Sequence, residues 1–121
     1  MSKFRVMIVQ KNGKPVGVRA AAINGRTIVL ALRDEPEQMN WHDAVKIGIP
    51  TKEEWMAIAE NLDAVNKALI RAGGELLKND WYWSSSEHNG GIAWTSYFGY
   101  SNGLDWGTKY GYNYVRPVLA F

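Results

Sequence analysis

Cysteine is absent from the 121 residues of the chain, and histidine occurs only at His42 and His88. Without cysteine the protein has no disulfide bonds, no thiolate catalysis and no metal site built on thiolates. Apolar runs are too short to span a membrane, no dense stretch of lysine and arginine is present, and the net charge is only +2. We therefore expect neither membrane insertion nor binding to nucleic acid.

Patterns typical of catalysis are equally sparse. His42 and His88 are far apart in the chain, and a Ser-His-Asp set drawn from residues 84–86, His88 and Asp105 lacks a supporting Gly-x-Ser-x-Gly motif. We interpret the hydroxyls of residues 84–86 as partners for backbone groups at a strand end. Gly90-Gly91 lacks the strand-to-helix setting of a phosphate-binding loop. The sequence therefore predicts a protein that is not an enzyme and needs no cofactor.

The last third of the chain has a composition unlike the rest. Residues 81–115 contain all six tyrosines, four of the six tryptophans and five of the six serines, but only three Asp, Glu, Lys or Arg side chains. Tyr and Trp provide a large contact area at low rotamer cost, while Ser, Gly and Asn adapt their hydrogen bonds. This mixture is typical of recognition loops, and we interpret residues 1–80 as their scaffold.

Residues 1–33 show the alternation and the turns of an antiparallel meander. Asn12-Gly13 and Asn24-Gly25 indicate tight turns, because both residue types tolerate positive φ. The apolar run at the start of the chain is short, so we predict no signal peptide and expect synthesis in the cytoplasm. The predicted strands cover residues 4–9, 15–23 and 26–33.

Residues 40–74 predict two or three helices. Asn40 can cap a short helix that ends at Gly48, and residues 51–54 form a capping box that starts the next helix. An apolar stripe at spacings of three and four fits one long helix or two helices, of which the second begins at a cap on Asp63. We favour the two helices. The stripe consists of Trp55, Ile58, Leu62, Val65 and Leu69.

Strand patterns return in residues 81–121. Trp94 and Phe98 alternate with Thr95 and Tyr97, so we expect the first pair to face the core and the second pair to face solvent. Further strands are predicted at residues 103–108 and 113–121. The order of strands, helices and strands predicts a single α+β domain over residues 1–121, with an antiparallel sheet that both ends of the chain close.

Tyr110, Tyr112 and Tyr114 alternate in the sequence and would share one face of an extended segment. A buried position for the three rings is one alternative. The absence of Val, Ile and Leu between Lys109 and Val115 favours the other, an exposed ladder of rings that binds a partner. We interpret Arg116 as a buried anchor for the loops, with direct contact to a ligand as the alternative.

Several motifs in residues 40–121 match a known pattern, namely residues 49–55, residues 82–87, Ala93, Trp94, Phe98, Gly103, Lys109 and residues 115–118. With these motifs the chain resembles the variable proteins of diversity-generating retroelements, which have a C-type-lectin-like fold. Undiversified bacterial surface domains of the same fold share a similar pattern. The resemblance implies antiparallel sheets with two or three helices between the N- and C-terminal strands.

In that family, adenine-directed mutagenesis rewrites chosen codons of a ligand-binding face and leaves the scaffold fixed. The resemblance implies that the fixed positions are Trp83, Ser84, Ser85, Ala93, Trp94, Phe98, Lys109, Val115, Arg116 and Pro117. The implied ligand-binding positions are His88, Asn89, Ile92, Thr95, Tyr97, Tyr100, Leu104, Asp105, Trp106, Thr108, Tyr110, Tyr112, Asn113 and Tyr114. Trp106 differs from the others, since adenine changes in an Asn codon cannot produce Trp; it is a fixed residue or descends from another template codon.

The resemblance implies a non-enzymatic receptor-recognition module for a protein or cell-surface ligand, with a glycan as a further option. A structural or oligomerising domain of a phage tail or bacterial surface assembly is the alternative, and the oligomeric state stays open. Sugar-binding C-type lectins hold calcium through Glu-Pro-Asn or Gln-Pro-Asp and Trp-Asn-Asp motifs. Here residues 35–37 lie in the wrong region and residues 40–43 begin a helix, so we expect no metal and no calcium-dependent sugar binding.

Overall fold

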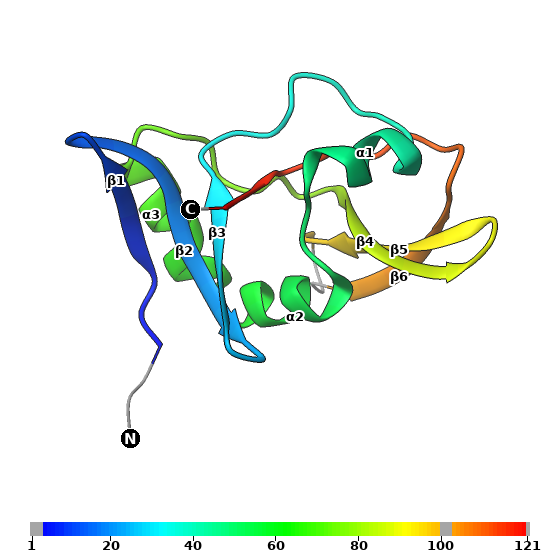
Figure 1. Cartoon of the computed structure of the whole chain (residues 1–121), viewed down its shortest axis with the longest axis horizontal. Coiled ribbons are helices and arrows are strands. Elements are labelled where there is room, and N and C mark those ends of the chain that lie inside the picture. Colours follow the sequence, from blue (N-terminus) through cyan, green and yellow to red (C-terminus); the bar gives the residue numbers. More distant parts are fainter. Residues whose placement is uncertain (1–3, 100–102, 121) are drawn as a thin grey trace.

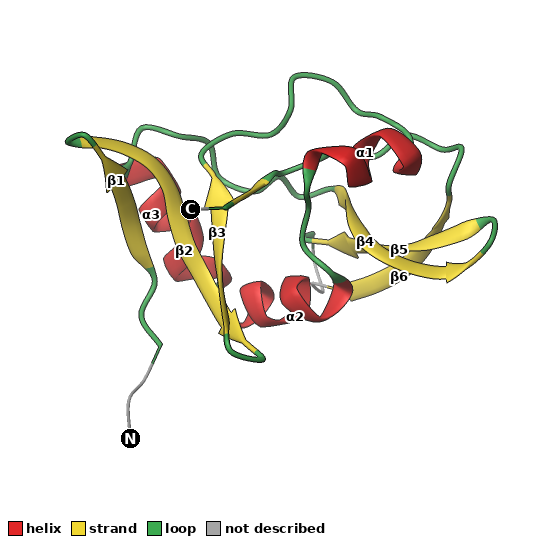
Figure 2. Cartoon of the chain, in the orientation of Figure 1, coloured by secondary structure: helices red, strands yellow, loops and turns green. Residues whose placement is uncertain are grey.

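The computed structural model describes residues 4–99 and 103–120. Within them the chain forms two antiparallel sheets and three helices (Figure 2), which confirms the predicted α+β class. The elements are β1 (Met7–Lys11), β2 (Lys14–Ile23), β3 (Arg26–Ala31), α1 (Trp41–Ile47), α2 (Lys52–Glu60), α3 (Leu62–Arg71), β4 (Trp81–Asn89), β5 (Ile92–Tyr97), β6 (Gly103–Thr108) and β7 (Val118–Leu119). None of the helices in these ranges is long and apolar enough to cross a membrane.

The first sheet has the strand order β1-β2-β3-β7, so strands from both ends of the chain belong to it as predicted, at its opposite edges (Figure 1). Its two hairpins turn at the predicted Asn-Gly pairs. Asn12 and Asn24 have φ values of 53° and 51°, and Gly13 and Gly25 follow with 76° and 75°. Two successive positive φ values give the turn a twist that matches the flanking strands. Asn-Gly pairs adopt these angles readily, and for that reason they predicted the positions of both hairpins.

The helices begin where their caps predict. The Asn40 side chain accepts a hydrogen bond from the backbone N–H of Asp43, and Thr51 and Glu54 make both hydrogen bonds of the capping box. The apolar stripe is divided between α2 and α3, as favoured. However, the division falls at Asn61, and Asp63 lies in the first turn of α3 instead of capping it, so that detail of the prediction is wrong.

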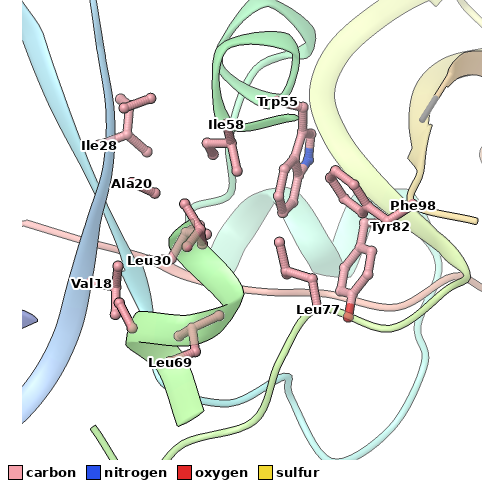
Figure 3. Close-up of a cluster of buried hydrophobic side chains, with 13 residues drawn as sticks. Val18, Ala20, Ile28, Leu30, Trp55, Ile58, Leu69, Leu77, Tyr82 and Phe98 are labelled. Carbon is pink, nitrogen blue, oxygen red and sulfur yellow. The ribbon is translucent and has the colours of Figure 1, made fainter. Parts of the chain in front are cut away.

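The main core joins the two sheets through α2 and α3 (Figure 3). Val18 and Leu30 of the first sheet pack with residues of both helices, and Trp55 of α2 continues the cluster toward the second sheet. The Trp55 ring lies 5.2 Å from the Phe98 ring and 5.5 Å from the Tyr82 ring, between centroids. These aromatic contacts fix the second sheet against α2.

The second sheet, β4-β5-β6, lies between α1 and α2, and its β4–β5 hairpin extends beyond both helices (Figure 1). A smaller core between α1 and this sheet contains Trp41, Ala44, Ile49, Trp83, Ala93 and Val115. Trp83 on β4 therefore faces α1, whereas its neighbour Tyr82 faces α2. Because alternate residues of a strand point to opposite faces, both faces of this sheet are partly covered.

Candidate binding surface

The second sheet carries most of the predicted ligand-binding residues, but it divides them between its two faces. Trp83 pairs with Thr95 and Thr95 pairs with Asp105, so these residues lie on the face toward α1. Trp94 pairs with Trp106 on the opposite face. The single ligand-binding face that the resemblance implied is therefore divided between two faces of this sheet.

The first surface, which we name the hairpin patch, consists of Lys52, His88, Trp94 and Trp106. The His88 ring stacks on Trp106 at 4.4 Å between centroids and meets the Trp94 ring edge-on at 5.6 Å. The Lys52 ammonium lies 4.3 Å from the centroid of the Trp94 ring. Trp106 remains 53% exposed, so the patch presents a large indole to solvent on a hydrogen-bonded strand.

The second surface, which we name the loop patch, consists of Tyr110 and Tyr112 with His42 of α1 beside them. Tyr110 is 80% exposed and Tyr112 is 65% exposed. The His42 ring lies 6.4 Å from that of Tyr110. For these two tyrosines the predicted exposure is confirmed, and neither ring contributes to the core.

Lys109 holds the loop patch in place from beneath. Only 2% of this residue is exposed, its ammonium lies 4.4 Å from the centroid of the Trp41 ring, and it donates to the Glu87 carboxylate. Its backbone N–H donates to Gly91 O at 3.0 Å, and its carbonyl accepts from the Trp41 N–H at 3.1 Å. The loop is therefore tied to both the β4–β5 hairpin and the start of α1.

The serines and Arg116 have the structural roles that the sequence indicated. Ser84 Oγ donates to Trp94 O at 2.7 Å, and Ser86 Oγ accepts from the Lys52 N–H at 3.0 Å. Arg116 is fully buried and its guanidinium donates to Asp34 and to three carbonyl groups. These contacts confirm the interpretation of Arg116 as an anchor.

The predicted binding residues differ widely in exposure. Tyr100 lies outside the described residues. Exposed positions are His88, Asn89, Asp105, Trp106, Thr108, Tyr110 and Tyr112; half-buried positions are Ile92, Tyr97, Leu104, Asn113 and Tyr114. Sequence reasoning missed His42, Lys52 and Trp94 as parts of the surface, because nothing local indicates that α1 and α2 flank this sheet.

The predicted orientation of β5 is wrong for Trp94 and Thr95, whereas Phe98, just beyond the strand, is buried as predicted and Tyr97 is half-buried. Thr95 is 3% exposed and its hydroxyl donates to Asp105 O at 3.1 Å, whereas Trp94 is partly exposed. The prediction placed the larger residue inside, but Trp83 on the neighbouring strand occupies the space under α1. Small residues must therefore lie opposite that indole, and Trp94 is directed to the other face.

The predicted exposure of Tyr114 is also wrong. Its ring is half-buried against Tyr82 at 5.9 Å between centroids, and the Lys78 ammonium lies 5.0 Å from it. The predicted strand over residues 113–121 is limited to isolated bridges at Asn113 and Tyr114 and to β7. Because Lys109 and Tyr110 lie in a turn and Gly111 in a bend, alternation does not carry the three tyrosines onto one face.

The two patches consist of aromatic and imidazole rings and the ammonium group of Lys52. Among the described residues, no three His, Asp or Glu side chains are close enough together to hold a metal ion. The groups with clearly perturbed pKa values lie elsewhere: desolvation raises the pKa of the buried Tyr82, and a hydrogen bond with Asp34 raises the pKa of the partly exposed Lys78. Neither group belongs to the two patches.

No protein-family model matches the chain, and neither a curated protein nor a solved structure is significantly similar to it. Function therefore has to be inferred from the geometry of the molecule itself.

Proposed function

We propose that the protein is a non-enzymatic binding module that recognises a protein or cell-surface ligand through its loop patch and hairpin patch. The high exposure of Tyr110 and Tyr112 is the observation that carries this proposal. Rings that are 80% and 65% exposed contribute little burial to the folded monomer. Tyrosines are well suited to contact a partner, because they offer large amphipathic area with few rotatable bonds.

The ordered backbone beneath these rings supports the same function. Gly111 N–H donates to Thr108 O at 2.9 Å, and Asn113 exchanges backbone hydrogen bonds with Met39 at 3.1 and 3.2 Å. Together with the bonds of Lys109, they fix the loop on both sides of the two tyrosines. A surface that is ordered before binding loses less conformational entropy when the ligand arrives.

We further propose that this module has a C-type-lectin-like fold and is a variable protein of a diversity-generating retroelement. In its support, strands from both ends of the chain share one sheet, and the helices lie between the N- and C-terminal strands in the sequence. Most positions that the resemblance assigns as fixed are buried, including Trp83, Ser84, Ala93 and Val115. Three fixed positions, Ser85, Trp94 and Pro117, are only partly buried. Among the implied ligand-binding positions, Thr95 is buried.

The coding DNA tests the diversification directly. A near-identical repeat beside the gene should differ from it at template adenines, and the differences should lie between the codons for Glu87 and Tyr114. Differences scattered outside that window, or at other bases, would contradict diversification and leave the binding proposal standing.

Binding itself is tested by selecting ligands from a random-peptide display library and a glycan array. Ligands selected on the wild-type protein should lose at least about tenfold in affinity for the Tyr110→Ala/Tyr112→Ala variant, since aromatic anchors dominate interface energies. The matched control is Met56→Ala/Ile70→Ala, which removes two side chains of 53% and 55% exposure from other surfaces. Equal binding to both variants, or turnover in esterase, phosphoesterase or glycosidase assays, would overturn the proposal.

Self-association is the competing outcome. If the tyrosine face packs against a second copy, the solution mass of the wild type should rise with concentration, and that of the double Tyr variant should not. This result would replace ligand recognition with the structural, oligomerising role.

A further inference from the structure

A small recess opens on the α1-facing side of the second sheet and shares one residue, Trp106, with the hairpin patch. Its volume is about 170 Å³, and the residues that line it are Trp81, Thr95, Asp105, Trp106, Gly107 and Asn113. Strand pairing places Trp83 opposite Thr95 and Thr95 opposite Asp105. Asp105 therefore lies on the same face of the sheet as Thr95, which also lines the recess. The recess therefore combines aromatic walls with one carboxylate.

Gly107 keeps this recess open. A Cβ atom at this position would lie 3.2 Å from the Trp83 ring and 3.3 Å from the Thr95 methyl group. Any larger side chain would have to fill the recess or displace the indole beneath it. The glycine thus leaves a concave site on a strand that otherwise carries side chains.

Trp81 forms an aromatic wall of the recess and packs against Tyr97 in a tilted pair. The rings of Trp81 and Tyr97 are 4.7 Å apart between centroids, with 37° between their planes, and both residues are half-buried. The contact with Tyr97 holds the Trp81 indole in place, so the wall is formed before a ligand arrives. The face of an indole carries negative partial charge and attracts cations.

Asp105 supplies a full negative charge at the mouth of the recess. Its Oδ1 accepts a hydrogen bond from the backbone N–H of Trp106 at 2.7 Å, which orients the carboxylate. Within residues 4–99 and 103–120, Asp105 has no ion pair with Lys, Arg or His. The neighbouring cation Lys109 is bound to Glu87 instead. The second carboxylate oxygen is thus available to a charged group from outside.

Elsewhere in the chain, an indole ring and a carboxylate together bind a lysine ammonium group. The Lys109 ammonium lies between the Trp41 ring and the Glu87 carboxylate, and that cation is almost completely buried. The recess repeats this pairing of an indole with a carboxylate, but without a lysine. An alkylammonium or guanidinium group is therefore the chemical complement of the recess.

We propose that the recess is a binding site for a cationic group of the ligand, an alkylammonium or a guanidinium such as the side chain of Lys or Arg. This inference rests on the proposed function, in that a ligand engaging the two patches would insert its cation beside Asp105. The indole of Trp81 packs against the cation and the Asp105 carboxylate pairs with it. Neutral or anionic groups of the same size gain neither interaction.

The test uses n-butylguanidinium and n-butylammonium as probes, with N-butylurea as the neutral control. Binding is followed by NMR through the indole N–H signals of Trp81 and Trp106. Both cations should shift these signals in a saturable manner that weakens with added salt, and N-butylurea should not. Equal shifts with all three probes, or no shifts, would overturn the inference.

Two substitutions separate charge from shape. Asp105→Asn keeps an oxygen for the Trp106 N–H and should weaken cation binding about threefold to fivefold, as expected for a solvent-accessible ion pair. Gly107→Ala should weaken it as well, because the added methyl group narrows the recess and presses on the Trp83 ring at 3.2 Å. Asp43→Asn, on exposed α1, is the control and should bind as the wild type does. Unchanged affinity in Asp105→Asn would contradict the inference.

The two proposals can fail independently. If the cations bind but no selected ligand depends on Tyr110 and Tyr112, the recess stands and the proposed function falls. If selected ligands depend on these tyrosines but the cations leave Trp81 unaffected, the proposed function stands and the recess falls.

Discussion

Arg116 and Asp34 form a buried ion pair, in which Arg116 Nε donates to Asp34 Oδ1 at 2.7 Å. The other oxygen of Asp34 accepts from Lys78 Nζ at 2.6 Å and from the Tyr82 hydroxyl at 2.9 Å. The remaining guanidinium nitrogens donate to carbonyls of Ala31, Glu75 and Leu76. This network joins the end of β3, the segment before β4 and the C-terminal segment, and thereby fixes the two sheets relative to each other.

Asp34→Asn should therefore be strongly destabilising. The substitution leaves Arg116 fully buried without its counter-charge, and removal of one partner from a buried pair costs about 3–5 kcal/mol. Urea unfolding measures the loss. The control is Asp63→Asn, which breaks the exposed pair with Lys67 and should cost no more than about 0.5 kcal/mol. Similar losses in the two variants would show that the network does not stabilise the fold.

Alkaline pH should destabilise the protein through Tyr82 and Lys78. Burial raises the pKa of Tyr82 above its usual value near 10, and the hydrogen bond with Asp34 raises the pKa of Lys78. In the unfolded chain both groups lose their protons first, so the stability that these two groups contribute is constant below about pH 9 and falls above about pH 10. Each proton of difference contributes a slope of about 1.4 kcal/mol per pH unit.

Tyr82→Phe tests this assignment. The variant should be less stable at pH 8 by about 1–2 kcal/mol, because Asp34 and the Lys78 N–H lose a hydrogen-bond partner. Its stability should then decline less steeply between pH 10 and 11 than that of the wild type. Chemical unfolding at fixed pH values gives both quantities, and identical slopes would exclude Tyr82 as the titrating group.

The parts of the fold that the sequence predicted correctly are those that neighbouring residues determine. The Asn-Gly turns and the caps at Asn40 and Thr51 depend on backbone angles and hydrogen bonds within four residues. The composition shift at Trp81 likewise marks the start of β4. Each of these features could be predicted because no distant contact competes with it.

The predictions that are wrong concern features that depend on side chains distant in the sequence. Alternation correctly predicted that Trp94 and Thr95 of β5 lie on opposite faces of the sheet. Which of the two faces is buried depends on Trp83, which pairs with Thr95 from β4, and on α1, which packs on Trp83. In the same way, Lys52 joins the hairpin patch through a helix that is remote in sequence. Packing between elements overrides the preference of a large residue for the interior.

Tyr112 and Tyr114 should differ in their contributions to stability. Tyr112 is 65% exposed, so Tyr112→Ala should change the unfolding free energy by less than about 0.5 kcal/mol. Tyr114 packs on Tyr82 and under the Lys78 ammonium, so Tyr114→Ala should cost about 2 kcal/mol. Urea unfolding of the two variants compares them directly. Equal costs would indicate that residues 110–114 form the continuous ladder that alternation predicted.

Lys109→Met should loosen the loop patch without unfolding the protein. Methionine fills a similar volume but removes the cation that joins the Trp41 ring to Glu87. Because Glu87 is 57% exposed it can be solvated by water, and the global cost should be only about 1 kcal/mol. The amide of residue 109, bonded to Gly91 O, and that of Gly111 should then exchange with solvent faster.

Hydrogen exchange measured by NMR compares these two amides with core amides of β2 and β3, which should be unaffected. Lys46→Met is the matched control, since that lysine is 76% exposed on α1 and should leave both amides unchanged. In a Glu87→Gln background the effect of Lys109→Met should shrink, because the partner charge is already absent. If Gly111 exchanges at the wild-type rate in Lys109→Met, the backbone hydrogen bonds hold the loop without the buried ammonium.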